Sequence, residues 1–173
     1  MNSFYPDIYA KDIYKIDYKK LKENGIKCLI FDLDNTLVSI YAKRPTRKIK
    51  ELFAYLDDLS FKIIIMSNSG KKRVTPFKEE LNVDSAYSSC KPLKKKYKII
   101  KRKYGYKDSE IACIGDQILT DIWGANKMNF TSIFVDKINE EDFVWTKLNR
   151  FIERKILNSF EKKESFKRGN YYG

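Results

Sequence analysis

The sequence predicts an α/β fold in which a central parallel sheet of five strands lies between two layers of helices. Short apolar runs alternate with helical patterns along the chain, as they do in parallel sheets. Four of the apolar runs also lead directly into polar residues, which is typical of strands that leave a buried sheet at its edge. The expected strands are Lys27–Asp32, Phe61–Asn68, Val83–Ser88, Glu110–Asp116 and Thr131–Asp136.

The segments between these strands have the spacing of amphipathic helices. Thr46 can cap a helix that runs to Leu59 with its apolar residues on one face. A length of 173 residues favours a single domain over residues 1–173. Residues 1–24 are expected to be a lead-in segment and residues 161–173 a flexible tail. The other expected helices are Lys71–Leu81, Pro92–Tyr104, Leu119–Met128 and Glu140–Phe160.

Composition limits the class of protein. The chain is 43% hydrophobic, which is enough for a core, but no apolar run approaches the ~20 residues of a membrane span. The N-terminus lacks a basic stretch followed by an apolar one, so no signal peptide is expected. Cys28, Cys90 and Cys113 are scattered and odd in number, which favours reduced thiols. These features indicate a cytoplasmic protein.

The charged residues restrict both chemistry and partners. There is no histidine, which excludes Ser-His and Cys-His catalysis and His-ligated zinc. The net charge is +12, from 35 Lys and Arg against 23 Asp and Glu. This excess is either a solvated, lysine-rich surface or a surface for an acidic partner, which is nucleic acid, an anionic membrane or a phosphorylated substrate.

Two aspartates, Asp32 and Asp34, stand at the end of the apolar run Cys28–Phe31. A carboxylate is costly to bury without partners, so both are expected where the strand leaves the sheet. Two carboxylates this close need a cation, a shared proton or both. Mg²⁺ is the expected cation, because hard oxygen ligands suit it.

Three further strand ends carry polar residues that belong at the same edge of a parallel sheet. Carboxylates, a lysine and a hydroxyl at one place are the groups that phosphoryl transfer uses. Each residue alone is a weak signal, because each also occurs in ordinary turns. Their order at successive strand ends is more specific. The residues concerned are Ser67 with Asn68, Lys91, and Asp116 with Asp121.

This order resembles the four motifs of the haloacid dehalogenase (HAD) superfamily, here Asp32-x-Asp34-x-Thr36, Ser67, Lys91 and Gly115-Asp116-x4-Asp121. A closer resemblance, to the YqeG family of HAD subclass IIIA phosphatases, is carried by Pro6-Asp7-Ile8-Tyr9, Cys90-Lys91-Pro92-Leu93 and Gly115-Asp116-Gln117. That family is similar to mitochondrial phosphatidylglycerophosphate phosphatases, which act in phosphatidylglycerol and cardiolipin synthesis. The resemblance implies a HAD-like Rossmannoid fold and a magnesium-dependent phosphomonoesterase, with phosphatidylglycerophosphate as the expected substrate.

The resemblance also implies roles for the charged residues. Asp32 is the expected nucleophile, which forms an aspartyl-phosphate. Asp34 is the expected general acid and then general base, and its backbone carbonyl is expected to bind Mg²⁺. The expected carboxylate ligands of Mg²⁺ are Asp32 and Asp116, with Asp121 as a further ligand or as a partner of the ligands. Lys91 is expected to neutralise the phosphorylated intermediate.

The remaining roles concern the substrate. Ser67 is expected to bind a phosphoryl oxygen, and Thr36 to orient Asp34 and the loop after the strand. Asn68 is a further candidate for substrate binding. Arg44 and Arg73 lie on loops after the first two strands, and they are candidates for gripping a second phosphate or a lipid headgroup.

The spacing leaves no room for a cap domain over the site. Thr36 to Phe61 holds a loop and one helix, and Asn68 to Lys91 holds one helix and one strand. An open site suits a phosphate presented by something large, such as a lipid at an anionic membrane surface. The aromatic residues of the lead-in segment either contact such a surface or pack across the sheet.

Two other functions stay open from the sequence. The same chemistry on nucleic-acid, protein or small-molecule phosphates fits the motifs equally well. A basic RNA- or ribosome-associated binding protein with a vestigial site fits the positive charge. For the lipid substrate, the expected location is the cytoplasm and the inner face of the membrane, without a transmembrane segment.

Overall fold

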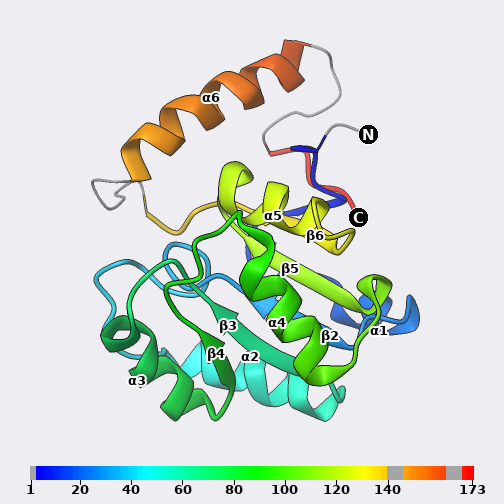
Figure 1. The fold of residues 1–173 in the computed structure, drawn as a ribbon, viewed down its shortest axis with the longest axis vertical. Coiled ribbons are helices and arrows are strands. Elements are labelled where there is room, and N and C mark those ends of the chain that lie inside the picture. The colour runs from blue at the N-terminus through cyan, green and yellow to red at the C-terminus, as the bar shows by residue number, and fades with distance from the viewer. Residues whose placement is uncertain (1–2, 140–145, 163–168) are drawn as a thin grey trace.

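In a computed structural model of the chain, the described residues form one parallel sheet of six strands between layers of helices (Figure 1). The structure describes residues 3–139, 146–162 and 169–173. The strand order is β1-β6-β5-β2-β3-β4, and every neighbouring pair is parallel. The strands are β1 (Ile8–Ala10), β2 (Cys28–Phe31), β3 (Lys62–Met66), β4 (Asp84–Ala86), β5 (Ile111–Gly115) and β6 (Thr131–Val135).

Strand β2 lies at the centre of the sheet, between β5 and β3. All four of its residues are buried, as the continuous apolar run Cys28–Phe31 requires of a strand covered on both faces. Leu29 pairs with Ile63 of β3 on one side and with Ala112 of β5 on the other. The residue after β2, Asp32, therefore emerges in the middle of the carboxyl edge of the sheet.

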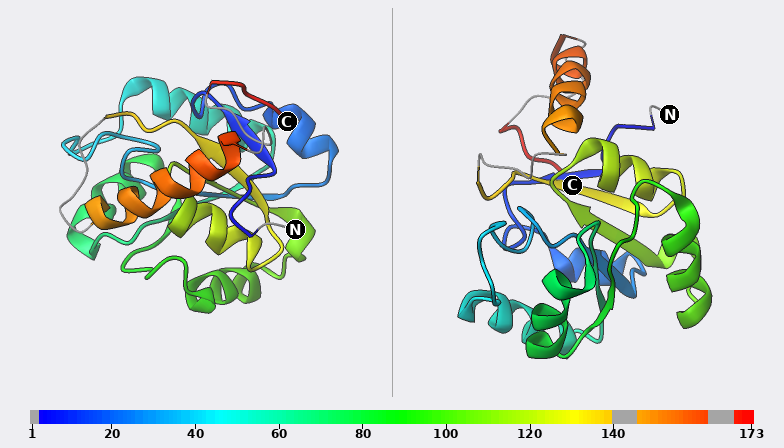
Figure 2. Two further views of the ribbon diagram at one scale, coloured as in Figure 1. Left: turned by 90° about the horizontal axis from the view of Figure 1, so that it is seen from above. Right: turned by 60° about the vertical axis from the view of Figure 1, so that its left-hand side comes forward.

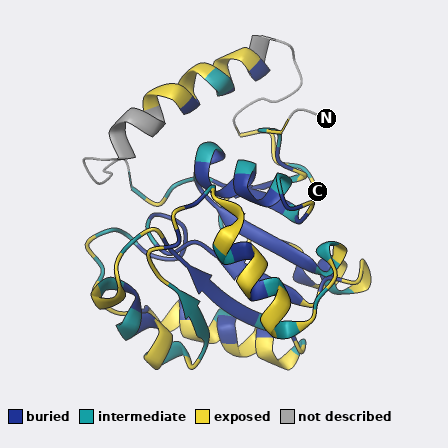
Figure 3. Ribbon diagram, in the orientation of Figure 1, coloured by how far each residue is buried: buried dark blue, intermediate teal, exposed yellow. Residues whose placement is uncertain are grey.

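The two faces of the sheet are covered by different helices (Figure 3). Leu29 and Phe31 point to the face covered by α1 (Tyr18–Glu23), α2 (Arg47–Asp58) and α3 (Lys71–Leu81). Cys28 and Ile30 point to the face covered by α4 (Lys94–Tyr104) and α5 (Trp123–Asn126). The alternation follows from the two-residue period of a strand. A short 3₁₀ helix, η1 (Asp108–Glu110), precedes β5, and a π-helix, η2 (Ile118–Ile122), precedes α5.

Local signals set several helix ends. Thr46 caps α2, because its hydroxyl accepts a hydrogen bond from the backbone N–H of Ile49 at 3.3 Å. Asn82 ends α3 and Gly105 ends α4, and both adopt the left-handed backbone conformation. The expected helix Leu119–Met128 differs from the structure, which begins it as the π-helix η2 and continues it as α5.

The prediction of five strands is short by one, because the lead-in segment contains β1. This strand pairs with β6, with Tyr9 opposite Phe134. On its other side, Tyr9 and Tyr172 exchange two backbone hydrogen bonds of 2.9 Å in an antiparallel bridge. The lead-in residues Tyr9, Ile13 and Tyr18 are buried, so these side chains pack within the protein. The aromatic residues of the lead-in segment were expected either to contact a membrane surface or to pack across the sheet. The structure favours packing for Tyr9 and Tyr18.

The C-terminal part of the chain also differs from the expected flexible tail. Helix α6 (Thr146–Lys162) contains the first two residues of the expected tail, 161 and 162. Near the other end of that tail, Tyr172 makes backbone hydrogen bonds to Tyr9 of β1. Figure 2 shows α6 on the outside of the body of the sheet. Its Leu157 and Phe160 are buried in a cluster with Tyr9 and with Ile118 of η2. Residues 140–145 and 163–168, which belong to the expected helix and tail, lie outside the described residues.

Within the described part of the chain, no helix combines the length and the apolar character that crossing a membrane requires.

Truncation of Leu56 tests the packing of α2 against the sheet. Leu56 is fully buried, so Leu56→Ala leaves a cavity and is expected to lower the free energy of unfolding by about 2–5 kcal/mol. The neighbouring Tyr55 is 39% exposed, and Tyr55→Ala serves as the control. Urea denaturation of both variants measures the difference. Equal losses in the two variants would contradict the packing described here.

Candidate functional site

Four loops bring polar side chains together at the carboxyl edge of the sheet. Asp32 follows β2, Ser67 follows β3, and Asp116 follows β5. Lys91 comes from the loop between β4 and α4, and Asp121 from η2. All five residues are buried. In the view of Figure 1, this edge lies at the upper left, where the arrows of the central strands end.

Lys91 is the centre of this group. Its ammonium nitrogen lies 2.5 Å from Asp32 Oδ1 and 2.7 Å from Asp121 Oδ1, so it donates to both carboxylates at once. Burial disfavours the charged form of Lys91, but Asp121 and Asp32 outweigh burial and raise its pKa above the ordinary value. The lysine is therefore held as a cation between two acids.

Three carboxylates form an acidic cluster around Lys91. Oxygen atoms of Asp32, Asp116 and Asp121 all lie within 4.8 Å of one another. Burial raises the pKa of Asp32 well above its usual range, Lys91 opposes this effect, and the charges of Asp121 and Asp116 add to it. A group of buried oxygen ligands with excess negative charge fits a hard divalent cation such as Mg²⁺. The expectation that the backbone carbonyl of Asp34 is a further ligand of Mg²⁺ stays a prediction.

A glycine makes room for the Asp121 carboxylate. A Cβ atom built on Gly115 would lie 2.2 Å from Asp121 Cγ, so only glycine fits at the end of β5. The π-helix turns Asp121 back toward the strand, because Asp121 N–H donates to Gln117 O at 2.9 Å. The backbone N–H of Gln117 donates in turn to Asp121 Oδ2 at 3.2 Å. The sequence Gly115-Asp116-x4-Asp121 thus places both carboxylates in one cluster.

Thr36 contacts a different aspartate from the one expected. Its hydroxyl donates to Asp116 Oδ1 at 2.9 Å, and both residues are buried. The expectation that Thr36 orients Asp34 is therefore wrong for the side chain. The hydroxyl instead orients a member of the acidic cluster, because the loop after β2 turns Thr36 toward β5.

Asp34 is separated from the acidic cluster by its own set of partners. Ser69 Oγ donates to Asp34 Oδ2 at 2.7 Å, and Ser67 Oγ lies 3.5 Å from the same oxygen. On the other carboxylate oxygen, Oδ1, Arg73 places Nε at 2.9 Å and Nη2 at 2.8 Å. Ser69 was not among the predicted site residues, and only its position two residues after Ser67 could have indicated it.

Arg73 also ties the loop after β2 to the site. Its Nη2 donates to the carbonyl of Ser39 at 3.1 Å, and its Nη1 donates to the carbonyl of Ala42. A guanidinium group can hold several acceptors in one plane, which a lysine cannot do. Arg73 was expected on a loop, as a candidate for gripping a second phosphate or a lipid headgroup. The structure places it in the first turn of α3, where it binds Asp34 and this loop, and its role toward the substrate stays a prediction.

Two other predicted substrate contacts have different partners in the structure. Asn68 Oδ1 accepts from the backbone N–H of Lys91 at 2.7 Å and from Ser89 Oγ at 3.0 Å, and its Nδ2 donates to Lys91 O at 3.3 Å. Asn68 therefore shapes the Lys91 loop. Arg44 pairs with Glu80 at 2.7 Å, in the last turn of α3. Its guanidinium is exposed, and its binding of a second phosphate or a lipid headgroup stays a prediction.

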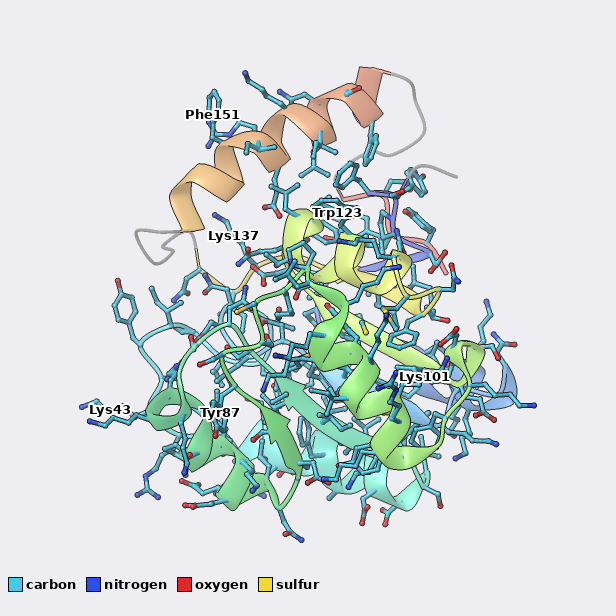
Figure 4. The ribbon with its side chains drawn as sticks, in the orientation of Figure 1. Lys43, Tyr87, Lys101, Trp123, Lys137 and Phe151 are labelled. Atoms are coloured by element: carbon cyan, nitrogen blue, oxygen red, sulfur yellow. The ribbon has the colours of Figure 1, made fainter. Side chains whose placement is uncertain are left out.

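A cavity of about 510 Å³ opens beside Asp116. It lies between the end of β6 and α6, where Lys137 and Arg154 line it together with Asp136 and Glu153. Figure 4 shows Lys137 on the side of the sheet that faces α6. The acidic cluster is thus bordered on one side by the C-terminal helix.

The comparisons with known proteins agree with this geometry. The family model described as "Mitochondrial PGP phosphatase" matches residues 1–138. A Bacillus subtilis protein named "Probable phosphatase YqeG" is 36% identical over 92% of this chain and 93% of its own length. An Arabidopsis thaliana protein named "Phosphatidylglycerophosphate phosphatase 1, chloroplastic/mitochondrial" is 25% identical over 91% of this chain, which spans 48% of that protein.

A solved structure shows the same fold. The cobalt-bound form of the deoxy-D-mannose-octulosonate 8-phosphate phosphatase from Haemophilus influenzae superposes with a TM-score of 0.54. The match covers 84% of this chain and 95% of that protein, with 14% sequence identity. At this identity the likeness supports the fold alone.

Replacing Gly115 tests how the acidic cluster is built. Gly115→Ala forces the Asp121 side chain to move, so the affinity for Mg²⁺ in titration calorimetry is expected to fall roughly 10–100-fold. Gly70→Ala is the matched control, because a Cβ atom there meets nothing within 4 Å. Circular dichroism checks that both variants are folded. A folded Gly115→Ala protein with unchanged Mg²⁺ affinity would rule out the cluster as the cation site.

Proposed function

The chain belongs to the family described as mitochondrial PGP phosphatase, and from this premise we propose that it hydrolyses phosphatidylglycerophosphate through an aspartyl-phosphate on Asp32. It is a phosphatase of the HAD type. What we propose beyond this family membership is the mechanism, the magnesium dependence and the substrate.

The different partners of the two motif aspartates are the observation that carries the mechanism. Asp32 lies in the buried acidic cluster with Lys91 at 2.5 Å, whereas Asp34 is half-buried and held by Ser69 and Arg73. Two carboxylates from one motif thus have different surroundings. Such a difference suits one nucleophile and one acid–base residue.

The first step transfers the phosphoryl group to the protein. A carboxylate oxygen of Asp32 attacks phosphorus and forms a bond to it, while the bond from phosphorus to the ester oxygen breaks. Asp34 gives its proton to that oxygen, so the alcohol leaves neutral. In the second step, Asp34 takes a proton from water, the water oxygen attacks phosphorus, and the bond to Asp32 breaks. Inorganic phosphate and the starting protein are the products.

The other residues stabilise the charge of the phosphoryl group and keep the reacting groups in position during these steps. Asp32, Asp116 and Asp121 would hold Mg²⁺, which would supply positive charge to offset that of the phosphoryl oxygens. Lys91 holds a second positive charge next to Asp32, where the phosphoryl group is attached. Ser67 Oγ, next to Asp34, is the hydroxyl available to a phosphoryl oxygen.

The similarity to phosphatidylglycerophosphate phosphatases and the open edge support the lipid substrate. Between β2 and β3 the chain forms only a loop and α2, and between β3 and β4 only α3. These two connections add no cap domain to the described chain. A phosphate on a lipid headgroup can therefore reach the edge from outside. A binding protein with a vestigial site is not favoured, because the full set of buried acids and Lys91 is assembled.

A substrate panel tests the proposed function. The full chain is incubated with vesicles that contain phosphatidylglycerophosphate, with end-phosphorylated oligonucleotides, with phosphopeptides and with sugar phosphates, each with Mg²⁺ and with EDTA. Release of inorganic phosphate is expected to be fastest from phosphatidylglycerophosphate and to be lost in EDTA. Faster release from one of the other classes would replace the lipid with that class.

Asp32→Asn is the negative control for this substrate panel. The amide cannot form the acyl-phosphate at neutral pH, so phosphate release is expected to fall below detection with every substrate, while circular dichroism stays unchanged. Turnover at the wild-type rate by this variant would refute the proposed nucleophile, whichever substrate is preferred.

Arg73→Lys tests whether Asp34 depends on its guanidinium partner. A lysine cannot hold the Asp34 carboxylate and two backbone carbonyls together, so kcat is expected to fall roughly 100-fold with a smaller change in KM. Arg44→Lys is the matched control, because Arg44 is an exposed arginine paired with Glu80. Equal effects of the two substitutions would show that Arg73 does not position Asp34.

A further inference from the structure

Exposed apolar side chains stand on the loops at the edge of the sheet that carries the site. Tyr41, between β2 and α2, is 65% exposed, and Leu93, just before α4, is 59% exposed. Tyr87, directly after β4, is 40% exposed. A single exposed apolar residue is ordinary, but a group of them around a site is typical of a surface that meets a partner.

The loop that presents Tyr41 is fixed rather than loosely attached. Ser39 Oγ accepts from the backbone N–H of Tyr41 at 3.3 Å and from Asn139 Nδ2 at 2.6 Å. Arg73 binds the carbonyls of Ser39 and Ala42 on the same loop. The arginine that holds Asp34 therefore also sets the position of Tyr41 next to the site.

Three of the loops at this edge, those after β2, β3 and β4, carry basic residues and no acidic residue other than Asp32 and Asp34, whereas Asp116 and Asp136 follow β5 and β6. The sequence ranges 35–50, 59–78 and 85–107, which include three of these loops, contain no aspartate or glutamate. Their exposed cations at the edge are Lys43, Lys71, Lys72, Lys94 and Lys95. An anionic surface is therefore attracted to these three loops.

Other acidic residues stand toward the opposite end of the strands and helices. They stand at the C-terminal ends of α2 and α3 and before or at the start of β4 and β5. In Figure 4, Lys43 projects outward on the loop side, whereas Lys101 lies toward the other end of α4. At that end the acids stand among lysines and pair with them, as Glu110 does with Lys27 and Asp84 with Lys62, so an anionic surface is met more favourably by the three basic loops. The residues are Asp57, Asp58, Glu79, Glu80, Asp84, Asp108 and Glu110.

We propose that this edge is a docking rim for an anionic lipid bilayer. The rim consists of the apolar Tyr41, Tyr87 and Leu93 and the basic Lys43, Lys94 and Lys95. The apolar side chains enter the boundary between headgroups and acyl chains, while the lysines are attracted to anionic headgroups. The site then faces the headgroups. The choice of a bilayer over nucleic acid rests on the proposed function and on Leu93, which offers no ring for stacking on bases.

Vesicle binding tests the docking rim without any turnover. The full chain is sedimented with vesicles of phosphatidylcholine alone and with vesicles that also contain phosphatidylglycerol. Binding is expected only to the anionic vesicles and is expected to weaken as salt is added. The double variants Tyr41→Ser/Leu93→Ser and Lys94→Gln/Lys95→Gln are each expected to lose roughly tenfold in affinity.

Matched variants outside the rim are the controls. Tyr55 on α2 and Ile99 on α4 are 39% and 49% exposed, so Tyr55→Ser/Ile99→Ser removes an exposed tyrosine and an exposed aliphatic side chain, as the rim variant does. Lys19→Gln/Lys20→Gln on α1 removes the same charge. Both controls are expected to bind vesicles like the wild type. Hydrolysis of the soluble ester p-nitrophenyl phosphate is expected to be unchanged in the rim variants.

Three results would overturn the docking rim. These are wild-type binding by both rim variants, equal losses in the controls, and tight binding to RNA with none to vesicles. The binding assay contains no phosphatidylglycerophosphate, so it stands apart from the proposed function. A protein that binds anionic vesicles through the rim but hydrolyses no phosphate would refute the proposed function alone.

Discussion

The buried ammonium of Lys91 is the interaction on which the rest of the site depends. It offsets the charge of Asp32 and Asp121, which burial would otherwise disfavour at this place. Breaking a buried ion pair by removing one partner costs about 3–5 kcal/mol, so the three side chains stabilise one another. The parallel sheet makes the contact feasible, because β2, the loop after β4 and η2 deliver these residues from distant parts of the chain to one edge.

Most of this edge follows from the sequence by a simple physical rule. Parallel strands end at the same edge, so the polar residues after the apolar runs had to lie together. This rule placed Asp32, Ser67, Lys91 and Asp116 correctly before any contact was known. The helix Lys71–Leu81 and the Thr46 cap were equally readable, because they depend on local spacing and on a local hydrogen bond. The roles assigned to the site residues stay predictions.

Three of the features that differ from expectation depend on contacts between distant segments. Strand β1 has three residues, too few for a pattern, and it is held by β6 and by Tyr172 at the other end of the sequence. The partner of Thr36 is Asp116, 80 positions away. Arg73 fits a phosphate-binding role in sequence terms, yet in the folded chain its nearest acceptors are a carboxylate and two carbonyls of the protein itself.

The amide of Asn68 has a consequence for how the site receives a phosphate. By accepting from Lys91 N–H and donating to Lys91 O, it fastens the loop after β3 to the loop after β4. Ser67 and Lys91 are thereby parts of one rigid body, and the spacing between hydroxyl and ammonium is set before a ligand arrives. Little conformational entropy is then lost on binding, so more of the contact energy is available to the reacting phosphorus. One side-chain amide thus ties together the two separate stretches of sequence that carry the proposed phosphate ligands Ser67 and Lys91.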